Sequence, residues 1–153
     1  MSRAFTRESD DPEPPPERAI STHPNLVTAR GLAAIEAQIR VLEGERQAAR
    51  AAADTALRAR IERDLRYWTA RRASARVVPK VEAPDRVRFG VQATLQSAGG
   101  AQQTFRLVGE DEADAAHGLL SWVSPLAQAL LGHAVGDSVP FQGAETEIVG
   151  LEP

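Results

Sequence analysis

Three side chains in the C-terminal third of the chain are of the types that act together in hydrolases. Ser124, His133 and Asp137 could supply a nucleophile, a base and an orienting acid. Ser124 precedes a proline, however, and no Gly-x-Ser-x-Gly nucleophile elbow surrounds it. The other two histidines, His23 and His117, lie in unrelated segments without the spacing of zinc ligands. The sequence therefore predicts neither a catalytic triad nor a zinc site, and we expect no catalytic residue of the chain's own.

Acidic side chains form two further candidate sites. One is a cluster made of Glu110, Asp111, Glu112 and Asp114. A calcium loop needs ligands at alternating positions and a bidentate acid further on, which this cluster lacks, so we expect a solvated acidic turn. The other is Asp54, which stands between two arginine-rich segments as either a helix cap or a weak ligand for a divalent cation.

Residues 107–136 contain the helix that explains the serine. They run from the end of a strand through the acidic turn and a second short strand to Ser124 and Pro125, which together are typical of a helix start. Gly132 is expected to end the helix. The residues expected to face the core are Leu126, Ala129, Leu130 and Leu131.

The elements around this helix predict an α+β domain over residues 86–153. Residues 86–96 alternate between apolar and polar side chains, as in a half-buried strand with Val87, Phe89, Val91, Ala93 and Leu95 on one face. Further strands are expected at residues 103–108, 138–141 and 147–151, with a turn at residues 97–100 and another at Gly143. The prediction is a small antiparallel sheet of four or five strands packed by one helix.

Two helices are predicted before this domain, over residues 25–52 and 55–75. Their apolar residues recur every three or four positions, which favours a narrow coiled-coil seam. The seam residues are Leu32, Ile35, Ile39 and Leu42 in the first helix and Leu57, Ile61, Leu65 and Trp68 in the second. Thr28 is the expected cap of the first helix, and Asp54 lies at the turn. An antiparallel hairpin with arms of roughly 30–36 Å is the simplest arrangement, and a two-chain bundle is the alternative.

The chain therefore divides into four expected regions. Residues 1–24 are rich in proline and poor in apolar periodicity, so we expect a disordered tail, in which Phe5 could still dock. Residues 25–78 form the hairpin and residues 79–85 a linker that Pro79 and Pro84 stiffen. Residues 86–153 form the C-terminal domain.

Charge and composition narrow the functional classes. Residues 40–76 carry ten arginines against five acids, a net charge of +5, whereas residues 86–153 carry three arginines against eight acids, a net charge of −5. A basic arm suits nucleic acid or an acidic channel, and an acidic body suits a basic surface. No run approaches the roughly 20 apolar residues that span a bilayer, and the chain has no cysteine. We expect a soluble, cytoplasmic protein that does not contact a membrane.

The order TFRLVGEDEAD, GLLSWVSPLAQALLG and VGD resembles the C-terminal domain of the bacterial Gre transcription factors, GreA and GreB. The resemblance is close over residues 86–151. It is looser over residues 25–78, where LVTARGLAAIEAQI resembles the opening helix of the family's coiled coil. It implies an FKBP-like domain that docks on the rim of the RNA polymerase secondary channel, and a coiled coil that enters that channel. It also implies contact with nucleic acid only within the transcription complex, and a monomer.

Two departures concern the tip of the hairpin. Each arm is shorter than in GreA or GreB, and the family's Gly-Asp-x-x-Glu-Asn tip, whose two acids help the polymerase hold a second Mg²⁺, reads AAADTALRAR here. Asp54 matches the aspartate, but Leu57 stands at the position of the glutamate. The resemblance thus implies no cofactor other than polymerase-held Mg²⁺. It leaves open whether the chain stimulates transcript cleavage or occupies the channel in competition with cleavage factors.

The partner-binding residues implied by the resemblance lie at the start of the predicted helix. They are Trp122, Val123, Ser124, Pro125 and Leu126. In the family a polar or acidic residue precedes the Ser-Pro turn, and this turn contacts the polymerase rim helices. Val123 replaces that residue here. Ordinary packing of Trp122 on the sheet is the alternative, and a dimeric coiled-coil adaptor is the rival function.

Overall fold

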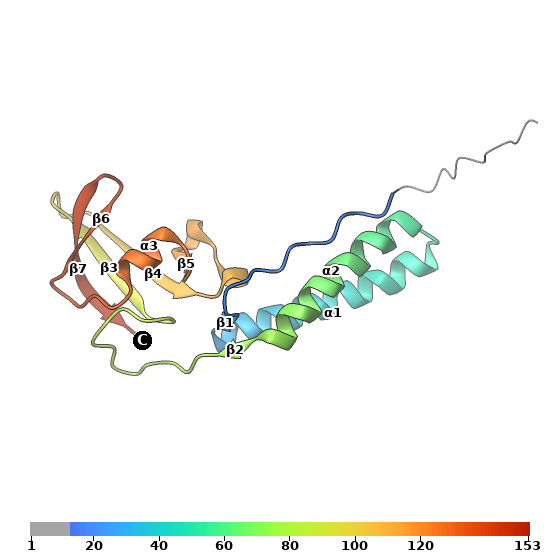
Figure 1. Cartoon of the computed structure of the whole chain (residues 1–153), viewed down its shortest axis with the longest axis horizontal. Helices are drawn as coiled ribbons and strands as arrows, with labels where there is room; N and C mark the ends of the chain where they lie inside the picture. Colours follow the sequence, from blue (N-terminus) through green and yellow to red (C-terminus); the bar gives the residue numbers. More distant parts are fainter. Residues whose placement is uncertain (1–12) are drawn as a thin grey trace, which may run out of the picture.

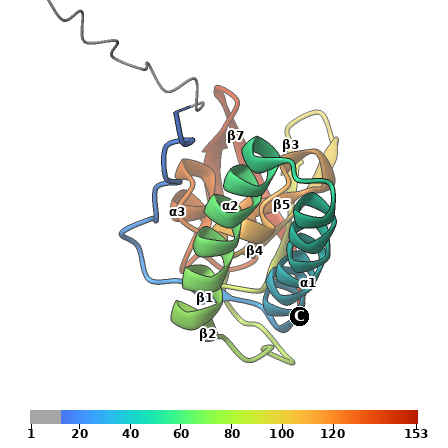
Figure 2. The ribbon, with the colours of Figure 1, turned by 90° about the vertical axis from the view of Figure 1, so that its right-hand side faces the viewer.

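The structure, a computed structural model, describes residues 13–153. A helical hairpin and a sheet domain lie end to end along the long axis of the molecule (Figure 1). Viewed along that axis, the two helices lie side by side in front of the sheet (Figure 2). The α+β class with an N-terminal helical hairpin is confirmed.

The hairpin consists of α1 (Ala29–Ala51) and α2 (Thr55–Ser74). Thr28 caps α1 as predicted, since its side chain accepts a hydrogen bond from the Gly31 amide. Ala53, with a φ of 53°, makes the reversal between the helices. The buried seam comprises Val27, Ile35, Ile39, Leu42, Ala49, Ile61 and Leu65. Leu57 was predicted to belong to this seam, but it lies near the tip and is 39% exposed, because α1 ends at Ala51 beside it.

A two-stranded parallel ladder closes the base of the hairpin. It pairs β1 (Leu26–Val27) with β2 (Arg76–Val77). Backbone bonds extend it, from the Arg76 amide to the Asn25 carbonyl (2.9 Å) and from the Val78 amide to the Val27 carbonyl (2.9 Å). The prediction that the first helix starts at Asn25 was therefore wrong, because this segment pairs with β2 before the helix begins at its cap.

The C-terminal sheet has the order β5-β4-β3-β7-β6. Its strands are β3 (Gln92–Ser97), β4 (Gln102–Val108), β5 (Leu119–Ser121), β6 (Ser138–Phe141) and β7 (Ala144–Glu152). The sheet is mixed rather than purely antiparallel, because β5 returns through two single-turn helices, Glu110–Glu112 and Ala115–His117, to run parallel to β4. The buried core comprises Val87, Ala93, Leu95, Leu107, Ala127, Leu130, Val139 and Ile148.

Two local predictions in this domain need correction. The strand expected over residues 86–96 begins only at Gln92, because the chain turns at Gly90, where φ is 85° and the Val91 amide donates to the Arg88 carbonyl (3.1 Å). In α3 (Pro125–Leu130), Ala127 and Leu130 are fully buried, so Ala127 rather than Ala129 faces the core. Ser124 caps α3 as predicted, accepting from the Ala127 amide.

The segment before the hairpin is extended and lies along α2 (Figure 1). Residues 13–24 contain no helix or strand, yet they contact α2 and the C-terminal domain through specific side chains that the expectation of a disordered tail did not anticipate. The predicted docking of Phe5 lies outside the described residues. Among residues 13–153, no helix is long and apolar enough to cross a membrane.

Candidate functional site

The tip of the hairpin carries Asp54 as the N-cap of α2. One of its carboxylate oxygens accepts a hydrogen bond from the Leu57 amide (2.9 Å). The neighbouring Arg58 pairs with Glu62 of the same helix at 3.6 Å. Within the part of the chain that the structure describes, no group of three or more His, Asp or Glu residues is arranged to hold a metal ion. The carboxylate of Asp54 thus stabilises the start of a helix, and Leu57 gives the tip an apolar side chain beside it.

The acidic turn lies against the base of the hairpin. Asp111 accepts hydrogen bonds from the Tyr67 hydroxyl (2.5 Å) and from Nε of Arg71 (2.5 Å). Arg71 is only 1% exposed, and its Nη2 donates to the side-chain oxygen of Asn25 (2.7 Å). The Asn25 amide group in turn donates to the Arg71 carbonyl (2.7 Å). We call these four residues the junction network, because they join α2, the start of the hairpin and the C-terminal domain.

Glu112 makes a second connection between the same parts. Its carboxylate accepts a hydrogen bond from the Thr28 hydroxyl (2.6 Å), the same hydroxyl that caps α1. A Cβ added at Gly31 would lie 2.7 Å from the Glu112 carboxylate, so the absence of a side chain there permits the contact. The expectation of a solvated acidic turn was therefore wrong for Asp111 and Glu112, whereas Asp114 is exposed as expected. It failed because the partners of Asp111 and Glu112 lie 40 to 84 positions earlier in the chain.

Tyr67, the only tyrosine of the chain, reports on the junction network. Burial, and then the hydrogen bond to the Asp111 carboxylate, raise the pKa of Tyr67 to about 12. The protonated phenol of Tyr67 therefore makes its full contribution to the stability of the folded state below the ordinary pKa of about 10. This contribution is lost as the pH rises from about 10 to 12.

Replacing Asp111 by alanine is expected to lower the pKa of Tyr67 towards 10, because the anion that disfavours tyrosinate is removed. Tyrosinate absorbance measured against pH, with circular dichroism to follow folding, checks this. Asp114→Ala is the control, since Asp114 lies in the same segment but binds His117. Identical titrations of Asp111→Ala and the parent chain would contradict the role given to Asp111.

The five residues predicted to bind a partner follow β5 directly, with Trp122, Val123 and Ser124 in a turn and Pro125 and Leu126 at the start of α3. The Trp122 amide donates to the Val108 carbonyl (2.9 Å), and the side chain of Gln128 donates to the Trp122 carbonyl (2.7 Å). Trp122, Val123, Ser124 and Leu126 are half-buried, and Pro125 is exposed. The ring of His23 meets the Trp122 indole edge-on, with 6.1 Å between centroids. This turn therefore adjoins the segment that precedes the hairpin, and its role in binding stays a prediction.

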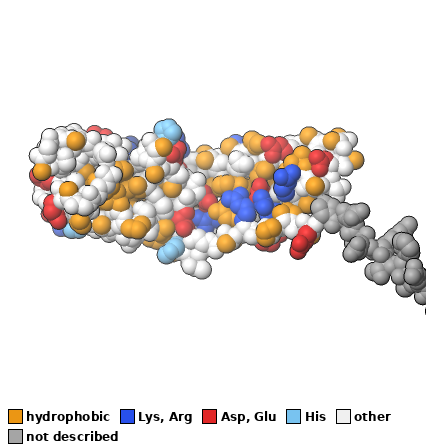
Figure 3. All heavy atoms as spheres, turned by 90° about the horizontal axis from the view of Figure 1, so that it is seen from above, with side chains coloured by type: hydrophobic (Ala, Val, Ile, Leu, Met, Phe, Trp, Pro, Cys, Tyr) orange, Lys and Arg blue, Asp and Glu red, His pale blue; other side chains and the backbone are white. Residues whose placement is uncertain are grey.

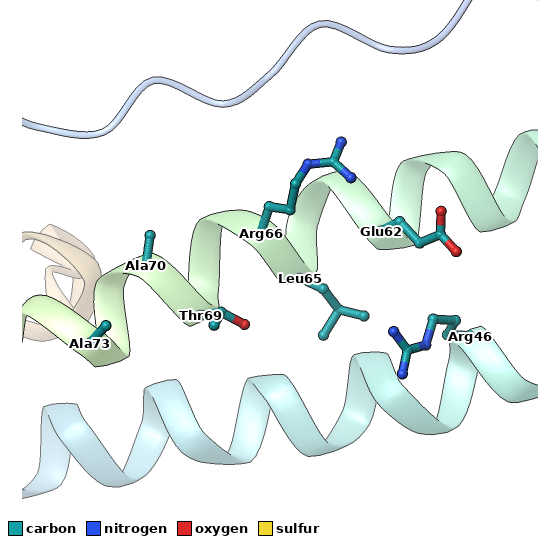
Figure 4. A pocket seen from close by; sticks show the side chains of 7 residues that line it. All are labelled: Arg46, Glu62, Leu65, Arg66, Thr69, Ala70 and Ala73. Carbon is teal, nitrogen blue, oxygen red and sulfur yellow. The ribbon is translucent and has the colours of Figure 1, made fainter.

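Basic side chains gather over the hairpin in the view of Figure 3. A groove of about 490 Å³ between α1 and α2 is lined by Arg46, Glu62, Leu65, Arg66, Thr69, Ala70 and Ala73. Figure 4 shows Leu65 and Arg46 pointing into this groove and Arg66 pointing out of it, towards the extended N-terminal segment. The two arginines at this groove thus come from different helices, Arg46 from α1 and Arg66 from α2.

Comparisons with known proteins match the C-terminal domain to one family. The family model described as transcription elongation factor GreA/GreB, C-terminal, matches residues 82–151. Transcription elongation factor GreB of Neisseria meningitidis serogroup A is 41% identical over 98 residues, which cover 60% of each chain. Transcription elongation factor GreA of Anaeromyxobacter sp. is 48% identical over 79 residues, covering 49% of this chain and 48% of its own. The matches thus span about half to three fifths of these relatives' lengths.

Several solved structures are also similar. GreA factor homolog 1 of Thermus thermophilus has a TM-score of 0.41 at 20% identity and covers 86% of this chain and 100% of its own. The GreA/GreB elongation factor of Nitrosomonas europaea has a TM-score of 0.41 at 21% identity, covering 84% and 98%.

Proposed function

We propose that the chain is a member of the GreA/GreB family of transcription elongation factors, as its match over residues 82–151 supports, and that it binds RNA polymerase through its C-terminal domain. The helical hairpin then enters the secondary channel and regulates elongation. The protein acts as a cytoplasmic bacterial monomer without a cofactor of its own, and any catalytic Mg²⁺ belongs to the polymerase. It meets nucleic acid only inside the transcription complex.

The family match over residues 82–151 carries this proposal, because the predicted partner-binding turn lies within it. Tryptophan is among the residue types that dominate binding energy at protein interfaces, and Trp122 lies two residues before Ser124, the N-cap of α3. Eight acids against three arginines in residues 86–153 suit a basic docking surface.

The residues at the tip of the hairpin favour a protein that occupies the channel over one that stimulates transcript cleavage. Two carboxylates on adjoining turns can share a divalent cation, but Leu57 replaces the second one and Asp54 is bound to the Leu57 amide. We therefore propose a regulator that modulates pausing or competes with cleavage factors. In a cleavage assay on backtracked complexes, the parent chain and Asp54→Ala should both leave the rate at that of polymerase alone. A parent chain that accelerates cleavage would instead make the protein a cleavage factor.

Co-purification with core RNA polymerase tests the proposed function. The parent chain should bind, and Trp122→Ala should weaken binding roughly 30-fold or more, the effect of losing about 2 kcal/mol at a hot spot. Ser124→Ala combined with Pro125→Ala should weaken it as well. Glu145→Ala, on the exposed end of β7, is the control and should bind normally. A parent chain that does not bind polymerase and has the mass of a dimer in solution would favour the dimeric coiled-coil adaptor instead.

A further inference from the structure

Residues 13–24, which we call the strap, contact both the hairpin and the C-terminal domain. The strap runs extended along α2, and Figure 4 shows it passing over the face of α2 from which Arg66 projects. Its side chains are mostly exposed, and it has no helix or strand of its own. Specific side-chain contacts must therefore keep it in place.

The first of these contacts is an ion pair between Glu17 and Arg66. It holds the pKa of Glu17 below its ordinary value, chiefly through the hydrogen bond from the Arg66 guanidinium. Both side chains are more than half exposed, however, and ion pairs of that kind contribute little to stability. The pair sets where the strap lies along α2 rather than how firmly it is held.

The second contact joins the strap to the junction network. The guanidinium of Arg18 stacks over the ring of Tyr67, 3.8 Å from its centroid, and reaches within 3.6 Å of the Asp64 carboxylate. Arginine over an aromatic face gains from both the charge and the flat stacking surface. Because the Tyr67 hydroxyl donates to Asp111, Arg18 lies one residue away from the acid that binds the C-terminal domain to α2.

The third contact reaches the C-terminal domain directly. His23 meets Trp122 edge-on, and two residues later Asn25 is buried in the junction network. The strap therefore contacts α2 through Arg18 and the C-terminal domain through His23. Asn25, which follows the strap, is fixed in the junction network between them. A segment attached on both sides of a joint limits the rotation of that joint.

We propose that the strap sets the direction of the hairpin relative to the C-terminal domain, with Arg18 and His23 as its positioning residues. This rests on the proposed function, because the direction matters only if the hairpin must enter a channel. The 23 residues of α1 form a helix roughly 35 Å long, so a rotation of about 10° at its base moves the tip by about 6 Å. A hairpin held in its binding direction beforehand avoids that loss of freedom when it binds.

Pulsed electron paramagnetic resonance on the full chain tests the strap. The chain has no cysteine, so spin labels attach only at introduced ones, Ala51→Cys near the tip and Glu145→Cys on the C-terminal domain, both exposed positions. The distance distribution between them should be narrow in the parent chain. It should at least double in width when Arg18→Ala and His23→Ala are combined, with the circular dichroism spectrum unchanged.

Conservative and control variants separate positioning from a general structural effect. His23→Phe keeps an aromatic edge against Trp122 and should retain the narrow distribution, whereas Arg18→Lys loses the flat stacking surface and should broaden it. Arg40→Ala combined with His117→Ala removes an exposed arginine and an exposed histidine away from the strap, and should change nothing. Equal widths for the parent chain and the Arg18→Ala, His23→Ala variant would overturn the proposal.

The measurement is made on the free protein, so it does not depend on polymerase. A broadened distribution in a protein that fails to bind polymerase supports the strap and removes the proposed function. An unchanged distribution in a protein that does bind polymerase removes the strap and supports the function. If both hold, the Arg18→Ala, His23→Ala variant should bind polymerase about tenfold more weakly than the parent chain, while the Arg40→Ala, His117→Ala control binds normally.

Discussion

Replacement of Arg71 by alanine should lower the free energy of unfolding by about 3–5 kcal/mol, the range for breaking a buried ion pair by removing one partner. The Arg71 side chain is 2% exposed and that of Asp111 10%, so truncation leaves a carboxylate that water reaches poorly. Glu110, whose carboxylate lies 3.6 Å from Arg71, loses a neighbouring cation too. The Asn25 side-chain oxygen also loses its donor.

Urea unfolding followed by tryptophan fluorescence measures this change. Arg72→Ala is the matched control, because Arg72 is the next residue of α2 but is exposed, and it should alter stability by less than about 0.5 kcal/mol. Arg71→Lys should recover only part of the loss, since an ammonium group cannot bind Asp111 and Asn25 with the geometry of a guanidinium. A loss below about 1 kcal/mol for Arg71→Ala would show that the network contributes little to the fold.

Replacement of Gly109 by alanine should destabilise the protein by about 1–3 kcal/mol, the usual cost of overpacking a buried site. A Cβ at this position would lie 2.5 Å from the Leu26 carbonyl oxygen, and backbone cannot move aside as a flexible side chain does. The φ of Gly109 is −66°, which alanine adopts without strain, so the whole effect comes from the contact with β1.

Gly44→Ala is the matched control for this substitution, with the opposite expected sign. Gly44 lies within α1 and nothing would come within 4 Å of its added Cβ, so alanine should stabilise the helix by about 0.5–1 kcal/mol. Unfolding of both variants in urea gives the comparison. If Gly109→Ala were as stable as the parent chain, the close approach of the acidic turn to β1 would not be required for folding.

The sequence alone determined the features that depend on neighbouring residues. The caps at Thr28, Asp54 and Ser124 were predicted because a short polar side chain satisfies amides only two or three positions ahead. The turn at Gly143 followed in the same way, from a residue that tolerates a positive φ. The helical seam followed from apolar spacing, and together these features gave the fold class and the family resemblance.

Tertiary structure alone decided how the parts are joined. The sequence predicts a solvated turn for the acids of residues 110–112, because no residue near them in the chain indicates that Arg71 and Thr28 bind them. The parallel pairing of β5 and the ladder of β1 with β2 were likewise hidden, since a two- or three-residue strand has too few side chains to show a period. The composition of the strap predicts disorder, although contacts of Arg18 and His23 place it against α2 and the C-terminal domain. Such contacts join residues tens of positions apart, and only the folded chain brings them together.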